Sequence, residues 1–212
     1  MPFIRLDMES YARKAHFDYF RSLSYPYVGV TVDVDVTNAL DFSRTQRRSF
    51  YLTFLHAAAL AADGIPAFRQ RIRGNGIVEY SECPTSHTEP ADGGRYCYCT
   101  LHHHMGLHEY FEQAEKARRE CVKNGITEDE DAESMYFVSA LPWFRYTSLI
   151  QPVAGGDESN PRLTWGKYET DGKGRTIMPV SVLAHHALVD GIQIAEFYRN
   201  LENEINILDP LG

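Results

Sequence analysis

The sequence has no run of about eighteen apolar residues, the length that a membrane-spanning helix requires. Its first residues, Met1 to Asp7, lack a positively charged segment followed by an apolar one, so we expect no signal peptide. Lysine and arginine together number 21 against 29 acidic residues, and the net charge of −8 argues against a nucleic-acid-binding surface. These absences predict a cytoplasmic protein with neither a membrane nor a nucleic acid as partner.

Cysteine is scarce. The chain has four, Cys83, Cys97, Cys99 and Cys121, at irregular spacing and without a CxxC pair, which favours reduced thiols over a disulfide framework or a zinc site. The consecutive histidines His102 to His104 suggest a metal site, but neighbouring residues of an extended segment point in opposite directions. An i, i+4 ligand pair such as HExxH is also lacking. The sequence therefore predicts no metal.

The patterns that are present indicate an α/β protein. With 212 residues, 43% of them hydrophobic and 24% charged, the chain suits one globular domain over residues 1–212. Apolar patterns predict strands at 27–36, 96–100, 135–141, 162–169 and 177–183, and a hairpin from 67 that turns near 74–76. Helices are predicted at 9–23, with Ser10 as a cap, and at 50–63, 107–122 and 191–205. Residues 43–48, 125–133 and 155–161 are predicted connections.

The segment His185 to Gly191, HHALVDG, lies between the last predicted strand and the last predicted helix. A strand that enters a helix through a tight turn fixes the side chains at the sheet edge, and Gly191 suits such a turn. A histidine imidazole loses its proton at about pH 6.5, so it can accept one from an alcohol near neutral pH. No serine or cysteine nucleophile is adjacent, which favours His186 as a direct general base. The alternative is a buried histidine pair that closes the strand.

This HHxxxDG segment is similar to the active-site signature of the chloramphenicol acetyltransferases, a motif shared with the acyltransferase domains of 2-oxo acid dehydrogenase complexes. Other segments resemble the same family in the same order: 11–17, with Tyr11 for a tryptophan, 65–72, 83–88, 139–143 with Ser148, 164–168 and 178–182. The chain has no lipoyl domain and no Ala/Pro-rich linker, which favours the free-standing enzymes. The resemblance implies a two-layer α/β sandwich with a mixed sheet. It also implies a homotrimer with active sites between subunits.

The family's catalytic roles carry over onto matching residues. The resemblance implies that His186 is the base, that Ser148 donates a hydrogen bond to the oxyanion, and that Thr164 holds a water near the transition state. It implies that Arg13 forms an ion pair with Asp190, although Asp190 could equally bind backbone amides at the start of its helix. Without the resemblance, Arg13 would be interpreted as a solvated helix residue and Ser148 as a structural one.

The binding residues follow in the same way. Lys167 and Tyr168 match the region of the coenzyme A pocket, and acetyl-CoA is the implied co-substrate, with no metal. The implied acceptor pocket contains Phe20, Thr88, Cys97 and Tyr146, and Phe20 replaces a tyrosine that commonly offers its hydroxyl to chloramphenicol. We therefore expect acetyl transfer to a hydroxyl of chloramphenicol. The alternatives are another hydroxylated small molecule as acceptor, or a non-catalytic trimer that binds a hydrophobic ligand.

Overall fold

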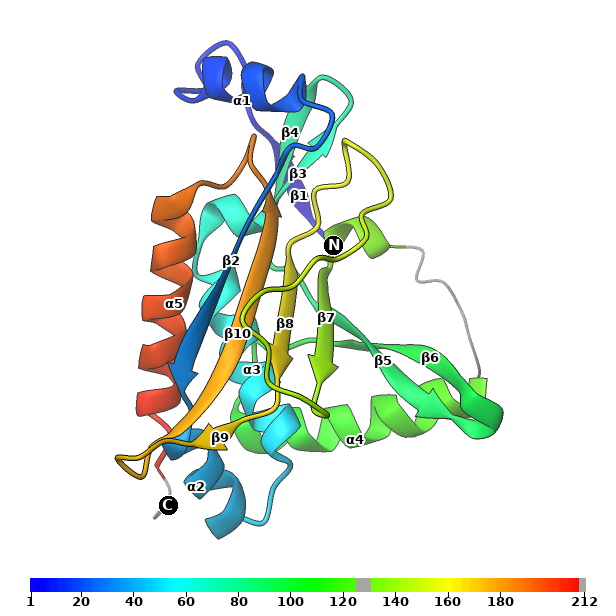
Figure 1. Ribbon diagram of the computed structural model, residues 1–212. Coiled ribbons are helices and arrows are strands. Elements are labelled where there is room, and N and C mark those ends of the chain that lie inside the picture. The colour runs from blue at the N-terminus through cyan, green and yellow to red at the C-terminus, as the bar shows by residue number, and fades with distance from the viewer. Residues whose placement is uncertain (125–130, 210–212) are drawn as a thin grey trace.

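The computed structural model describes residues 1–124 and 131–209 (Figure 1). Its larger sheet is seven-stranded and runs in the order β2-β10-β8-β7-β5-β6, with β9 paired to β10. The strands are β2 (Tyr27–Asp35), β5 (Thr85–Ala91), β6 (Arg95–Leu101), β7 (Tyr136–Leu141), β8 (Arg162–Gly166), β9 (Glu169–Thr170) and β10 (Thr176–His185). The pairs β5–β7 and β7–β8 are parallel and the others antiparallel. The predicted mixed sheet is confirmed.

Helices cover one face of this sheet and leave the other face to loops (Figure 1). The helices are α1 (Lys14–Arg21), α2 (Thr37–Thr45), α3 (Phe50–Asp63), α4 (Leu107–Asn124) and α5 (Gly191–Asn206). Of these, α1 lies beyond the end of the sheet rather than on its face (Figure 1). Nearly every side chain of α3 is buried, because this helix lies between the sheet and its neighbours α4 and α5. The hydrophobic core therefore lies between the helices and the sheet, as in a two-layer sandwich.

A smaller sheet, β1-β4-β3, packs beside the larger one. It is formed by β1 (Phe3–Arg5), β3 (Gln70–Arg73) and β4 (Gly76–Tyr80), after the 3₁₀ turn η1 (Pro66–Arg69). Gly74 has a φ of 60°, which a side chain would disfavour, so the predicted hairpin turns where expected. Two further 3₁₀ turns are η2 (Asp92–Gly94) and η3 (Ala132–Ser134).

The predicted strand at 162–169 ends at Gly166, the first helix has different bounds, and two elements were missed. The first helix begins at Lys14 rather than at residue 9, because the Ser10 hydroxyl bonds Asp7 instead of capping a helix. Residues 37–45 form α2, which was missed because only Ala39, Leu40 and Ser43 are buried on this short polar helix, so the predicted connection at 43–48 is wrong for residues 43–45. Strand β5 was missed because it contains Glu89 and Pro90. Of the predicted connection at 125–133, residues 125–130 lie outside the described part.

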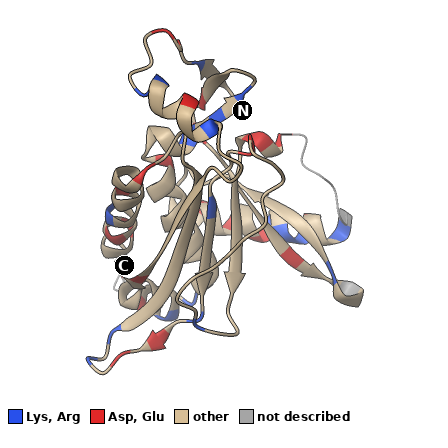
Figure 2. Cartoon of the chain, turned by 45° about the horizontal axis from the view of Figure 1, so that its top comes forward, with Lys and Arg blue, Asp and Glu red and all other residues tan. Residues whose placement is uncertain are grey.

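Charged residues are interspersed rather than gathered by sign over the described elements (Figure 2). Helix α4 carries acidic and basic residues along its length, whereas the strands of the larger sheet are mostly uncharged (Figure 2). Within the described residues, no helix is both long and apolar enough to cross a bilayer.

Candidate active site

His186 lies where the chain leaves β10 and turns toward α5. Its backbone N–H donates to the Pro26 carbonyl at 2.7 Å, and its ring Nδ1 lies 2.9 Å from the Val189 carbonyl oxygen. Because a carbonyl only accepts, this contact requires the proton on Nδ1, so in the neutral ring the free lone pair is on Nε2. The turn thus fixes the tautomer that a general base needs. The partner is a backbone atom, so no side-chain pattern in the sequence could have indicated it.

Two rings of α1, those of Phe20 and His16, pack against the His186 imidazole. Phe20 stacks on it with ring centroids 3.8 Å apart, and the His16 ring meets it edge-on at 5.4 Å. His16 Nε2 lies 2.7 Å from the His186 carbonyl oxygen, which binds α1 to the turn. Phe20, predicted to contact the acceptor, therefore also restricts the ring rotation of His186.

Asp190 has two partners, so both alternatives raised by the sequence are present. Its Oδ2 lies 3.1 Å from Arg13 Nη2, which confirms the predicted ion pair. Its Oδ1 accepts a hydrogen bond from the Ile192 N–H at 2.9 Å, and Gln193 Oε1 accepts from the Asp190 N–H in return, a capping box that starts α5. Arg13 also donates to the Leu188 carbonyl at 3.1 Å. Asp190 thus shapes the turn, while the Val189 carbonyl orients the His186 ring.

The neighbouring His185 has a different environment. It is 1% exposed, its Nε2 lies 2.8 Å from the Gly156 carbonyl oxygen, and its Nδ1 accepts from the Ala187 N–H at 3.2 Å. Both ring nitrogens are therefore occupied. Burial lowers the pKa of His185 below its ordinary value, so the ring stays neutral. These contacts suit a structural role and separate His185 from His186.

Ser148 lies in the exposed loop after β7 and lines a cavity of about 260 Å³. His186 is not among the residues that line this cavity, which include Tyr27, Thr31 and Ser181. Gln151 also lines it and donates from Nε2 to Thr164 Oγ1 at 2.8 Å. The structure thus places Ser148 and Thr164 near Gln151, a residue that the sequence analysis missed because it lies in a loop without periodicity.

Tyr146 packs over β8 beside Thr164. Its hydroxyl donates to the Thr164 carbonyl at 3.0 Å and accepts from Ser181 Oγ at 3.2 Å. A Cβ at Gly166 would come within 2.9 Å of the Tyr146 ring, so the glycine leaves room for this close packing. Tyr146 is therefore held in place by hydrogen bonds to β8 and to the Ser181 hydroxyl of β10.

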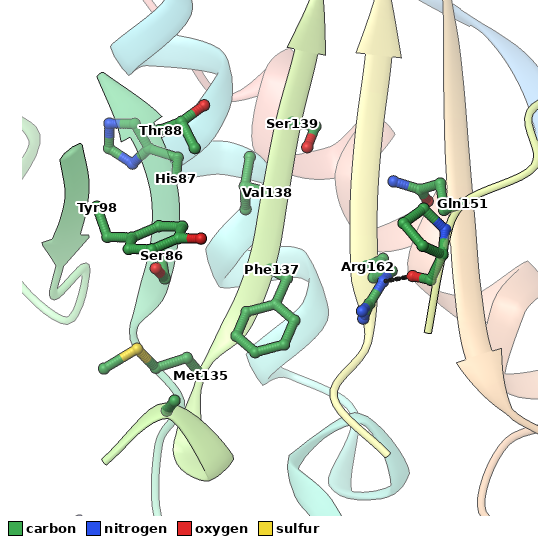
Figure 3. Close-up of a pocket in the computed structure, with 12 residues that line it drawn as sticks. Ser86, His87, Thr88, Tyr98, Met135, Phe137, Val138, Ser139, Gln151 and Arg162 are labelled. Carbon is green, nitrogen blue, oxygen red and sulfur yellow. Dashed lines mark hydrogen bonds between the residues drawn. The ribbon is translucent and has the colours of Figure 1, made fainter. Parts of the chain in front are cut away.

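A larger cavity of about 440 Å³ lies on the open face of the sheet, over β5, β6 and β7 (Figure 3). Thr88 and Tyr98, which are paired across β5 and β6, line it together with Phe137 and Gln151. Cys97 points to the opposite face of β6, is completely buried, and has its Sγ 2.8 Å from Cys121 Sγ of α4. The strand therefore offers Tyr98 rather than Cys97 to this cavity, since side chains alternate along a strand.

The residues matched to the coenzyme A region follow β8. Lys167 and Tyr168 are both exposed, and the Lys167 N–H donates to the Phe144 carbonyl at 3.0 Å. The Tyr168 ring meets Phe50 at the start of α3 with centroids 5.3 Å apart. An exposed lysine next to an anchored aromatic ring can bind a phosphate and an adenine, respectively.

A mixed α/β sandwich whose last strand enters an HHxxxDG turn is the arrangement of a CoA-dependent acetyltransferase, and this chain is one. The family model described as chloramphenicol acetyltransferase matches residues 1–202, so the chain belongs to the chloramphenicol acetyltransferase family.

Individual relatives agree with this assignment. A chloramphenicol acetyltransferase of Escherichia coli is 28% identical over 205 residues, which cover 93% of this chain and 91% of that protein. One of Proteus mirabilis is 24% identical over 200 residues, with coverage of 93% and 92%. A solved chloramphenicol acetyltransferase superposes with a TM-score of 0.83 at 24% identity, covering 95% of this chain and all of that one. The dihydrolipoamide acetyltransferase of Azotobacter vinelandii shares the fold, with a TM-score of 0.65, 16% identity, and coverage of 91% and 86%.

Proposed function

We propose that this enzyme transfers the acetyl group of acetyl-CoA to a hydroxyl of chloramphenicol by direct general-base catalysis. The observation that carries the proposal is the contact between His186 Nδ1 and the Val189 carbonyl, because in the neutral ring it places the free lone pair on Nε2. Nε2 removes the proton of the acceptor hydroxyl while the hydroxyl oxygen attacks the thioester carbonyl carbon. The tetrahedral intermediate then collapses, the C–S bond breaks, and the imidazolium returns its proton to the leaving thiolate. No covalent acyl-enzyme is needed.

Ser148 has the proposed role of oxyanion donor. Acyl transfer builds negative charge on the former thioester oxygen, and a fixed hydroxyl donor stabilises that charge more in the transition state than in the ground state. Thr164, which accepts from Gln151, would hold a water close to the same oxygen. Asp190 and Arg13 would maintain the turn that presents His186.

We further propose a homotrimer whose active sites lie between subunits. Within the described chain, Gln151 lines both the cavity that contains Ser148 and the larger cavity. His186, in contrast, lies at the end of β10 beside α1. A second copy could bring its His186 to the Ser148 side. The edge strand β2 supports such an assembly, because Val30 and Val32 on it are 41% and 36% exposed. Since acetyl-CoA is a cytoplasmic metabolite, we expect the enzyme in the cytoplasm.

The acceptor has one alternative that the structure favours specifically. Phe20, which stacks on His186, presents no hydroxyl to an acceptor, so a hydroxylated compound other than chloramphenicol is a second candidate. Incubation with acetyl-CoA, a thiol reagent and chloramphenicol, with a panel of other alcohols in parallel, distinguishes the two. Thiol release with chloramphenicol supports the first proposal, and release only with another alcohol supports the second. No release with any acceptor would indicate a binding protein. Chloramphenicol resistance in a sensitive host that expresses the enzyme, but not in one that expresses His186→Ala, would support the first proposal in cells.

A further inference from the structure

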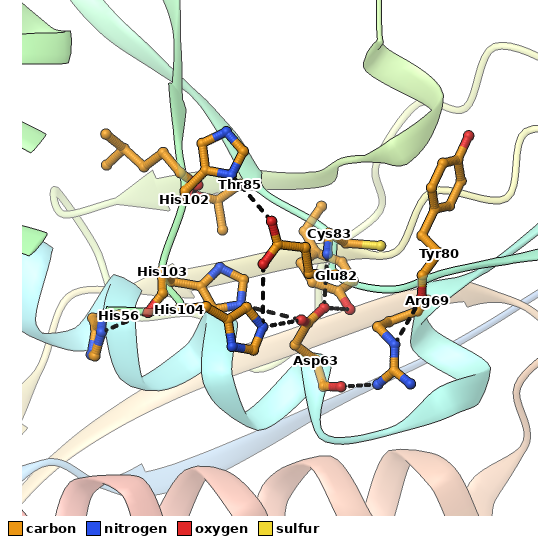
Figure 4. A network of polar contacts seen from close by, with 12 residues as sticks. His56, Asp63, Arg69, Tyr80, Glu82, Cys83, Thr85, His102, His103 and His104 are labelled. Atoms are coloured by element: carbon orange, nitrogen blue, oxygen red, sulfur yellow. Dashed lines mark hydrogen bonds and ion pairs between the residues drawn. The ribbon is translucent and has the colours of Figure 1, made fainter. Parts of the chain in front are cut away.

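A second group of polar side chains lies at the C-terminal end of α3 (Figure 4). Asp63 is the last residue of α3, and His103 and His104 follow β6. One ligand atom from each, a carboxylate oxygen and two imidazole nitrogens, lies within 4.8 Å of the others. We call these three residues the Asp63 cluster. None of them has a role in the proposed acetyl transfer.

Asp63 is held at Oδ1 by groups outside the cluster, and its Oδ2 is directed at the two histidines. Its side chain is 2% exposed, and Oδ1 accepts hydrogen bonds from the Cys83 N–H at 3.0 Å and the Tyr136 hydroxyl at 2.9 Å. Oδ2 faces the two histidines, with His104 Nε2 at 2.5 Å and His103 Nε2 at 3.5 Å. Figure 4 shows both rings directed at this carboxylate. The position of Asp63 is thus fixed before either imidazole is considered.

His103 is the incompletely bonded member of the cluster. Its side chain is 2% exposed, and neither ring nitrogen forms a hydrogen bond among the described residues. At 3.5 Å from Asp63 Oδ2, Nε2 has an ion-pair distance without hydrogen-bond geometry. A buried polar group without a partner costs about 1–3 kcal/mol, so a site that retains one requires an explanation. A bound ligand on Nε2 would supply the missing partner.

The chain conformation removes the sequence-based objection to metal binding. The Met105 N–H donates to the His103 carbonyl at 2.8 Å, so the backbone turns at His104 and is not extended. As a result the two imidazoles lie on the same side, with ring centroids 4.6 Å apart. The missing ligand partner, Asp63, comes from a helix about forty residues earlier, and local spacing cannot reveal such a contact.

We propose that the Asp63 cluster binds a divalent transition-metal ion, with Zn²⁺ the best match, through Asp63 Oδ2, His103 Nε2 and His104 Nε2. Imidazole nitrogen and carboxylate oxygen suit zinc, which bonds them at about 2.0–2.2 Å in a tetrahedron. Ligand atoms of such a tetrahedron lie about 3.3 Å apart, which small rotations of the two rings would achieve. Glu82 Oε2, 3.9 Å from His104 Nε2, can supply the fourth ligand and brings the carboxylate charge to −2.

The surroundings give this ion a route of entry and a structural task. The side chains of His104 and Glu82 are 48% and 33% exposed, so the cluster opens to solvent on their side, while Asp63 and His103 close it on the other. An ion there would join the end of α3 to the segment between β6 and α4. The site would therefore stabilise the fold and leave acetyl transfer unchanged.

The test uses the full chain, stripped of metal with a chelator and titrated with Co²⁺ and Zn²⁺. We expect one equivalent of Co²⁺ to give the intense visible absorption of a four-coordinate site, and Zn²⁺ to displace it and raise the melting temperature. His104→Ala changes a half-exposed side chain and should weaken binding by roughly 100-fold or more. His108→Ala is the matched control, because His108 is 75% exposed and contacts only Glu112 among the ion pairs of the described residues.

A third variant separates this site from the proposed active site. His186→Ala should keep the full equivalent of Co²⁺, because His186 is not part of the cluster. A four-coordinate Co²⁺ signal that disappears only in His104→Ala would establish the site. Absence of that signal in the unaltered protein, or an equal signal in His104→Ala, would overturn the proposal. The cluster would then be a hydrogen-bonded group without a metal. The Co²⁺ spectrum of the unaltered protein decides the question even if a variant fails to fold.

Discussion

Arg13 and Asp190 are 177 positions apart in the sequence and are joined by an ion pair of 3.1 Å. Their side chains are 27% and 29% exposed, so the pair is neither fully buried nor freely solvated. Loss of either charge should therefore cost about 1–2 kcal/mol, between the values for exposed and buried pairs. The ion pair connects the start of α1 to the turn that contains His186, and α1 also contacts His186 through Phe20.

We predict that Arg13→Val and Asp190→Asn each lower the melting temperature. The loss of unfolding free energy in the double variant should be about 1 kcal/mol smaller than the sum of the two single losses. Asparagine is chosen at 190 because its oxygen can still accept from the Ile192 N–H, whereas alanine would also lose the helix cap, at about 1 kcal/mol. Denaturant unfolding of the four species measures the coupling. Strictly additive losses would show that the ion pair contributes nothing to stability.

His186→Ala should abolish acetyl transfer and leave the fold intact. A positioned general base contributes about 10²–10⁴-fold to the rate, and the half-buried ring contributes little to the core. The measurements are kcat with saturating acetyl-CoA and the melting temperature. Retention of more than a small fraction of the activity would place the base on another residue.

The stability of the protein should depend on pH through His185. Burial lowers the pKa of this group in the folded state, whereas in the unfolded chain it is about 6.5, so the unfolded chain binds the extra proton. The stabilisation is complete above about pH 6.5 and declines below it, by at most about 1.4 kcal/mol per pH unit for one proton.

His185→Gln tests this assignment, since glutamine can donate to the Gly156 carbonyl and accept from the Ala187 N–H without titrating. Melting temperatures between about pH 7.5 and about pH 5.5 should fall less steeply for the variant than for the unaltered protein. Parallel curves would mean that other groups cause the acid sensitivity.

Much of the fold was predictable because local pattern and tertiary packing agree. The bounds expected for α3 are those observed, since a long apolar run follows Ser49, whose hydroxyl accepts from the Leu52 N–H. Helix α2 was missed because little of this short polar helix is buried, and strand β5 was missed because polar and charged residues are buried there by contacts distant in sequence. Glu89, for example, is 6% exposed and paired with Arg118 of α4.

The sequence indicated candidate side chains for the site but not their arrangement. Spacing within HHxxxDG and the resemblance indicated His186 and the Arg13–Asp190 pair. They could not indicate the Val189 carbonyl, because every residue has one. The face to which Cys97 points depends on strand register, and a shift of one residue reverses it. The contact between Asp63 and His104 could not be predicted from the sequence, because only the folded chain brings these two residues together.

Ser148→Ala should lower kcat by about 10²–10³ with little change in the KM for the acceptor, the usual cost of one oxyanion donor. The hydroxyl is exposed in its loop, so the variant should melt at the same temperature as the unaltered protein. Steady-state kinetics with each substrate varied in turn give both constants. A change confined to KM would assign Ser148 to acceptor binding.

The last prediction concerns which subunits supply His186 and Ser148. Among the described residues, Ser148 shares its cavity with Gln151, while His186 is enclosed by α1 and its own turn. We therefore expect each site of the proposed trimer to combine His186 of one subunit with Ser148 of the next. His186→Ala and Ser148→Ala homotrimers would each have only defective sites. Mixed trimers from co-expression would contain one interface with both residues intact, so activity should recover to roughly a third of the unaltered rate. Mixed trimers are isolated by two different affinity tags and compared with the separately expressed variants. If the mixed trimers stay as inactive as the His186→Ala enzyme, the two residues act within one subunit, and the proposed arrangement of the active sites is wrong.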